Sequence, residues 1–286
     1  MIGAAAVARY TLVELARRRL VLVFVAIGIA LTTGLGIAPL VLPGSQTSLD
    51  KTVFLLTGIS RVDGLAIELC AFAIGMTVIN HDLDSGAIVG ILAKPVTRFA
   101  YAAGKLGASL FLLLLLASIL TAGSMLVLEL NGGGNIDVLF WFFSANAANW
   151  LLLMLLVTIL TVYLNNIVAA AIVVAFNFVQ DQVSTLHAMV QNNVITDRIL
   201  SAIVGIVYWL VPHPLVSNME RAIAIANFNS TCARGCPAIQ PDPQQYLAHL
   251  LARIPGASGG GDIVFWLAYL AVVCALLYVA LRRKQV

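Results

Sequence analysis

Charged side chains are scarce in this chain of 286 residues. Asp, Glu, Lys and Arg make up 10% of the residues and 61% are hydrophobic, whereas a soluble domain carries about 25% charged residues. The 16 basic and 13 acidic side chains are too few to cover a water-soluble globule of this length. Several uncharged runs approach or exceed the roughly 20 residues that cross a bilayer as a helix. The composition therefore predicts an all-α integral membrane protein embedded in the lipid bilayer.

An excess of positive charge and a cysteine framework are also missing. The net charge of +3 cannot neutralise many phosphates, which excludes nucleic acid as a partner. Four cysteines are too few for a disulfide scaffold, and Cys70 and Cys274 lie in apolar runs. Cys232 and Cys236 form the one local pair, on the predicted outer side, where oxidising conditions permit a bridge. We expect this pair to be a disulfide; free thiols are the alternative.

Motifs for catalysis and nucleotide binding are absent. The sequence contains no G-x-x-x-x-G-K-[ST], H-E-x-x-H or G-x-S-x-G pattern, and its four histidines lie far apart without neighbouring ligands. We therefore expect no enzymatic activity, and no cofactor or metal bound by this chain.

The uncharged runs predict six membrane spans in a single domain, 1–286. The run 138–180 carries no charge and is about twice the length of one crossing, so it is divided at Asn165 and Asn166. The spans lie at about 20–42, 64–80, 106–128, 141–164, 167–186 and 263–281. A polar loop joins the first two spans and holds Asp50, Lys51, Arg61 and Asp63.

Two further helices are predicted outside the spans. Residues 1–19 have an imperfectly amphipathic pattern, which predicts an N-terminal interfacial helix. The run 199–211 is short and closes with Pro212, which favours a re-entrant or interfacial helix before the last span.

The basic residues set the predicted orientation. Short cytoplasmic loops and flanks collect Lys and Arg, and six crossings place ten of the sixteen basic residues on one side. Both termini are therefore predicted to be cytoplasmic, in a multi-pass protein of the cell (plasma) membrane. The segment 187–262 is then mostly extracytoplasmic.

Glu68 falls inside the second predicted span, and Asn177, Gln180 and Asp181 fall late in the fifth. A carboxylate at mid-membrane costs at least about 2.5 kcal/mol, so such residues commonly serve function. One interpretation is a polar translocation path or a proton relay. In the alternative, Glu68 lies one turn from the interface, Asp181 lies near the outer end of its span, and both reach water or an amide.

The polar segment 81–105 carries the most specific pattern. Asp82 and Asp84 are suitable caps for a helix that begins near Gly86, and Pro95 ends that helix. Its apolar residues recur at i, i+3 and i+4: Ile88, Ile91 and Leu92. This stripe packs either on lipid or on its own bundle, or it docks a soluble partner.

The same segment resembles the permeases of the type 2 ABC transporter family. The resemblance rests on two acids, a glycine, Leu-x-Lys-Pro-Val-x-Arg and a following Gly-Lys. The matching residues are Asp82, Asp84, Gly86, Leu92, Lys94, Pro95, Val96, Arg98, Gly104 and Lys105. The family often has glutamates at the two acidic positions, and Ser or Thr where Ala93 stands. Residues 208–212 (Tyr-Trp-Leu-Val-Pro) also resemble the family's aromatic-Leu-Pro stretch.

The resemblance implies a six-span permease that pairs with a second permease copy, identical or paralogous, and with two separate ATPase subunits. Those partners bind ATP and Mg, and the helix between spans 2 and 3 transmits their motion. Most members of the family are exporters. Two alternatives stay open: an ion- or proton-coupled secondary transporter that uses Asp181 or Glu68, and a non-transporting membrane scaffold subunit.

Overall fold

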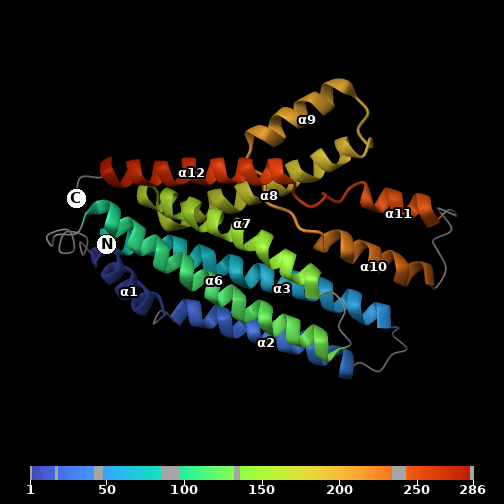
Figure 1. Cartoon of the computed structure of the whole chain (residues 1–286), viewed down its shortest axis with the longest axis horizontal. Coiled ribbons are helices and arrows are strands. Elements are labelled where there is room, and N and C mark those ends of the chain that lie inside the picture. The colour runs from blue at the N-terminus through green and yellow to red at the C-terminus, as the bar shows by residue number, and fades with distance from the viewer. Residues whose placement is uncertain are drawn as a thin grey trace.

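The computed structural model describes residues 2–16, 19–41, 48–84, 97–131, 136–233 and 243–283. Within these ranges the chain forms helices joined by short connections, and no strand occurs (Figure 1). The helices are α1 (Ile2–Ala16), α2 (Arg19–Val41), α3 (Ser48–Thr77), α4 (Asn80–Asp84), α6 (Arg98–Leu130), α7 (Ile136–Tyr163), α8 (Asn166–Gln191), α9 (Arg198–Leu210), α10 (Met219–Ala233), α11 (Pro243–Leu251) and α12 (Gly260–Arg283).

Five helices of the described chain are long and apolar enough to cross a membrane: α3, α6, α7, α8 and α12. The all-α character and the membrane class are thereby confirmed. The first predicted span corresponds to α2, an apolar helix of 23 residues that is not among these five. The predicted division of the long uncharged run is also confirmed, because α7 ends at Tyr163 and α8 begins at Asn166. The Asn165 side chain caps α8 by accepting a hydrogen bond from the Ile167 amide, 3.2 Å away.

The predicted polar loop between the first two spans is wrong. Its residues Asp50, Lys51, Arg61 and Asp63 all lie within α3, and the candidate span there runs from Val53 to Asp82. Charge misled the prediction, because Asp63 does not face water and is only 1% exposed.

The carboxylate of Asp63 is satisfied inside the bundle. It accepts hydrogen bonds from Thr32 on α2 (3.2 Å) and from Ser124 on α6 (2.5 Å). A charged residue that finds such partners in neighbouring helices does not need to end a span.

Helix α3 occupies the centre of the bundle and contacts α2, α6, α7 and α10. Its residues Ile67, Ala71 and Ile74 are fully buried in the core formed with α6 and α7. Gly75 permits the close approach of α7, because a Cβ there would lie 2.8 Å from the carbonyl oxygen of Met154. The central position of α3 explains why Asp63 faces other helices, whereas Arg61 on the same helix is exposed.

The two ends of the bundle differ in content (Figure 1). Helix α1 and the C-terminal end of α12 lie at one end, and α10 and α11 lie at the other. The short helix predicted at 199–211 is α9, which packs against α8. Asp197 starts α9 by accepting hydrogen bonds from the amides of Ile199 (2.8 Å) and Leu200 (2.9 Å). Helices α10 and α11 were not predicted within the segment 187–262.

Candidate functional site

A polar cavity of about 240 Å³ lies between α3, α7, α8 and the beginning of α10. All four residues predicted for a translocation path line it: Glu68, Asn177, Gln180 and Asp181. The structure therefore brings together side chains separated by more than one hundred positions in the sequence. We call this space the inner cavity.

One face of α8 supplies most of the polar lining. Asn177, Gln180 and Asp181 are spaced at i, i+3 and i+4, which places them on neighbouring positions of the same helical face. Gln180 is only 7% exposed, whereas Asp181 is exposed. Because α8 continues to Gln191, Asp181 lies about three turns before the helix end. The interpretation of Asp181 as a residue near the outer end of its span stays a prediction.

Glu68 lies at the middle of the candidate span Val53–Asp82. The alternative interpretation placed it one turn from the interface by counting from a span that starts at residue 64, whereas α3 begins at Ser48. That interpretation also expected an amide partner, and this part is confirmed. The amide of Asn177 donates a hydrogen bond of 2.9 Å to Oε1 of Glu68.

Two further cavities continue from the inner cavity. The second has a volume of about 240 Å³ and shares Asp181 and Glu220 with the first. The third, of about 400 Å³, shares Ser184 with the second and reaches Tyr208 and Asp262. The three cavities are thus neighbours, placed from the middle of α3 to the region between α8, α9 and α12.

Three polar lining residues were missed from the sequence: Asn146, Asn149 and Glu220. Asn146 and Asn149 are spaced at i, i+3 in an uncharged run, and this spacing is a signal that points to one polar face of α7. Asn149 also fixes the loop before α10: its amide donates to the Leu215 carbonyl and its oxygen accepts from the Leu215 amide, both at 2.9 Å. Glu220 gave no signal, since it lies in a segment predicted to be outside the membrane.

Acidic side chains around these cavities have no basic counterpart in the described ranges. Among the residues that the structure describes, no Lys or Arg lines the first or second cavity. In the described part of the chain, no ion pair reaches Glu68, Asp181 or Glu220. Nor do three His, Cys, Asp or Glu side chains of that part converge as metal ligands. The cavity is therefore acidic without the geometry of a metal site.

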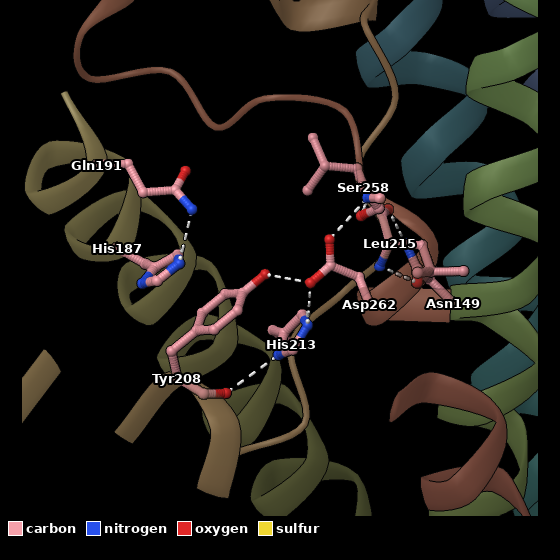
Figure 2. Close-up of polar contacts among 10 residues, drawn as sticks. Asn149, His187, Gln191, Tyr208, His213, Leu215, Ser258 and Asp262 are labelled. Carbon is pink, nitrogen blue, oxygen red and sulfur yellow. Dashed lines mark hydrogen bonds and ion pairs between the residues drawn. The ribbon is translucent and has the colours of Figure 1, made fainter. Parts of the chain in front are cut away.

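At the far end of the third cavity, Asp262 is the centre of a small polar cluster (Figure 2). Its Oδ1 accepts a hydrogen bond from the Tyr208 hydroxyl at 3.1 Å and lies 3.3 Å from Nε2 of His213. Its Oδ2 accepts from the Gly259 amide at 2.8 Å, which caps the beginning of α12. Asp262 thereby ties α9 and the loop after it to α12.

Stacked rings support the same connection. Tyr208 lies between His187 of α8 and His213, with ring centroids 3.8 Å apart on each side. His213 also stacks on Phe265 of α12, at 4.9 Å. Three helices are thus joined by one continuous stack of rings.

Replacing Asp262 with alanine should loosen α9. The change removes the acceptor for Tyr208, the neighbour of His213 and the cap of α12, so we expect a loss of about 1–2 kcal/mol in local stability. Hydrogen exchange of residues 198–216 would measure it as faster exchange. Asp137→Ala, at the first turn of α7 and exposed, is the control and should leave exchange in α9 unchanged. Equal exchange in the two variants would contradict this role of Asp262.

The opposite end of the bundle holds a buried charged cluster around Lys105. The Lys105 ammonium lies 2.7 Å from Asp82 and 3.5 Å from Glu14, and Lys105 is 1% exposed. The Tyr101 hydroxyl donates a 2.7 Å hydrogen bond to Asp82. We call Glu14, Asp82, Tyr101 and Lys105 the Lys105 cluster. It joins α1, α4 and α6.

The Lys105 cluster includes two residues of the predicted ATPase-coupling segment, Asp82 and Lys105. A third, Gly104, lies against α1, where a Cβ would come within 2.7 Å of the Ala4 carbonyl oxygen. Asp84 and Arg98 are placed only as the last residue of α4 and the first of α6. The other predicted residues lie outside the described residues: Gly86, Ile88, Ile91, Leu92, Lys94 and Pro95.

The cysteines are placed only in part. Cys232 lies in the last turn of α10, not in a loop, and it is disulfide-bonded. Cys70 and Cys274 are free. Cys236 lies outside the described residues, so its bridge to Cys232 stays a prediction.

The structure thus contains two candidate functional sites. One is an acidic cavity at mid-bundle, and the other is a buried ionic cluster at the end that holds α1. Comparison with known proteins adds nothing to them: the sequence matches no protein-family model and no curated protein sequence.

Proposed function

We propose that this chain is the permease subunit of an ATP-driven transporter of the type 2 ABC kind, acting as an exporter. It works with separate ATPase subunits, which bind ATP and Mg, and with a second permease copy. In this proposal α2 is the first of six crossings of the plasma membrane, and both termini are cytoplasmic. The arrangement in which α1 and the end of α12 share one end of the bundle agrees with an even number of crossings (Figure 1).

The Lys105 cluster is the observation that carries the proposal. The segment 85–96, predicted to meet the ATPase, lies in the sequence between α4 and α6. Asp82 and Lys105, one on each side of it, are held together by a buried ion pair of 2.7 Å. A movement of this segment would therefore be transmitted to the Lys105 cluster, which joins α1, α4 and α6.

The Lys105 cluster is connected to the inner cavity through two helices. Helix α3, which carries Glu68, continues into α4. Asn80 at the start of α4 donates a 2.9 Å hydrogen bond to the side chain of Asn166, the first residue of α8. Helix α8 carries Asn177 and Asp181. A displacement of the Lys105 cluster would therefore be transmitted to both α3 and α8, which line the inner cavity. This connection supports a transport role for the cavity.

Leu92→Asp is the test of ATPase docking. Leu92 belongs to the apolar stripe with Ile88 and Ile91, and a carboxylate forced into an apolar contact costs several kcal/mol unless it is paired. We expect the ATPase to co-purify with the native chain and to be lost from the variant, with ATP turnover reduced at least tenfold. Span insertion should be unchanged.

The matched control for that experiment is Ala93→Asp. Helical spacing of 100° per residue places Ala93 away from the stripe, so the control adds the same charge on the other side of the predicted helix. Native recovery of the ATPase with Ala93→Asp and loss with Leu92→Asp would support the proposal. Equal recovery and turnover in both variants would remove its mechanism.

A secondary transporter is the second candidate function. The observation that favours it is the placement of Glu68 and Asp181 on one cavity, without a basic partner in the described residues. Such a protein would transport without ATP and would lose transport in Asp181→Asn. Transport that stops when ATP is removed, at a constant proton gradient, would exclude it.

A further inference from the structure

The inner cavity contains a buried polar group that the protein itself leaves without a partner. Gln180 is 7% exposed and lines the cavity, yet its amide forms no hydrogen bond with any described residue. Side chains as buried as Gln180 are nearly always hydrogen-bonded, so its amide, which borders the cavity, indicates that a ligand group binds there.

The charge of the inner cavity indicates the sign of the charge on its ligand. Glu68, Asp181 and Glu220 line it together, and no basic side chain of the described chain lines it with them. A cation entering this space is attracted by all three carboxylates, of which Glu68 is half-buried and Asp181 and Glu220 are exposed. An anion would be repelled by the same groups. The site therefore selects for positive charge.

The rest of the lining defines the remainder of the ligand. Trp150 and Phe176 line the cavity beside several leucines, and aromatic faces attract cations as well as apolar groups. A bare metal ion does not suit the site, because three His, Cys, Asp or Glu side chains do not converge as ligands within the described chain. The volume of about 240 Å³ suits a small organic molecule.

We propose that the inner cavity binds the ammonium group of a small amphipathic organic cation. Glu68, Asp181 and Glu220 supply negative charge, and the Gln180 side chain accepts a hydrogen bond from the ammonium N–H. Trp150 and Phe176 cover the apolar part of the ligand. The inference rests on the proposed function, since it names the class of substrate that the transporter carries. It needs no ATPase for binding, and this separates its test from the test of docking.

The probe is 2-phenylethylammonium, which is positively charged at pH 7 and combines an ammonium group with an aromatic ring. Binding would be measured by calorimetry on the full chain in phosphatidylcholine nanodiscs, whose lipids carry no net charge. Two molecules of similar length serve as comparators, neutral 3-phenylpropan-1-ol and anionic 3-phenylpropanoate. We expect the cation to bind at least tenfold more tightly than the alcohol, and the anion not to bind. Equal binding of all three, or no binding of the cation, would overturn the proposal.

Neutralising the carboxylates tests their contribution. Asp181→Asn and Glu220→Gln keep side-chain size while removing charge, and each should weaken binding of the cation about tenfold. Asp137→Asn and Glu129→Gln remove the same charges from exposed positions that do not line the cavity, and should leave affinity unchanged. Equal affinity in the cavity variants and the controls would show that general attraction, and not this site, holds the probe.

Gln180 provides a test that does not change charge. Gln180→Leu removes the acceptor from the cavity and should weaken binding of 2-phenylethylammonium several-fold. Gln182→Leu is the matched control, because Gln182 lies two positions along α8, is exposed and does not line the cavity. Unchanged affinity in Gln180→Leu would contradict the assigned contact. Selective cation binding without a co-purifying ATPase would support this inference while overturning the proposed function.

Discussion

Replacing Lys105 with methionine is expected to lower the free energy of unfolding by about 3–5 kcal/mol, because a buried ion pair loses one partner. Lys105 is 1% exposed, and its ammonium lies 2.7 Å from Asp82 and 3.5 Å from Glu14. Without it, the Asp82 carboxylate stays buried with only Tyr101 as a hydrogen-bond donor of the cluster. Thermal unfolding in detergent should show a midpoint lower by about 10 °C.

Two further variants make that result specific. Arg253→Met removes a basic side chain from an exposed position and should shift the midpoint little. The double variant Asp82→Asn with Lys105→Met removes both charges and should recover part of the loss, because a buried neutral amide is less costly than an unpaired carboxylate. A midpoint for Lys105→Met equal to that of Arg253→Met would show that the Lys105 cluster does not hold the helices together.

The same variant bears on coupling between the ATPase and the bundle. If the Lys105 cluster transmits movement from the segment 85–96 to the bundle, then weakening the cluster should reduce the amount of substrate transported for each ATP hydrolysed. Leu92→Asp should instead abolish docking itself. Comparing the two variants separates contact with the ATPase from transmission into the bundle.

The sequence was sufficient for the parts of the fold that depend on local pattern. Long uncharged runs predicted α6, α7, α8 and α12, and Asn165 marked the boundary between α7 and α8 because an asparagine caps a helix by itself. Some polar residues of the inner cavity were also identifiable, since Glu68 and Asp181 are conspicuous in apolar surroundings. Local composition carries that information without knowledge of neighbouring helices.

Features that depend on partners from other helices could not be predicted. Asp63 looked like a loop residue until Thr32 and Ser124 supplied hydrogen bonds from α2 and α6. Glu220 looked like part of an external segment, although it lines a cavity with Glu68. In both positions the side chain is interpretable only from contacts between residues far apart in the sequence. A scan for charge therefore detected Glu68 and misplaced the other two.

Gly104→Val is expected to separate α1 from α6. A Cβ at Gly104 would lie 2.7 Å from the Ala4 carbonyl oxygen and 3.0 Å from the Val7 Cβ. Backbone oxygen cannot rotate away as a side chain can, so α1 itself must shift, at a cost of about 2–3 kcal/mol. Hydrogen exchange should become faster throughout residues 2–16, and the unfolding midpoint should fall.

Gly107→Val, three residues further along α6, is the control for Gly104→Val. A Cβ at Gly107 would meet no atom within 4 Å, while the change in helix propensity is the same in the two variants. The difference between them therefore measures the steric contact alone. Because α1 carries Glu14, displacement of this helix should also remove one carboxylate from Lys105, and Gly104→Val should reduce coupled transport while Gly107→Val does not. Identical exchange rates for residues 2–16 in the two variants would mean that the approach of α1 to α6 is not what positions the Lys105 cluster.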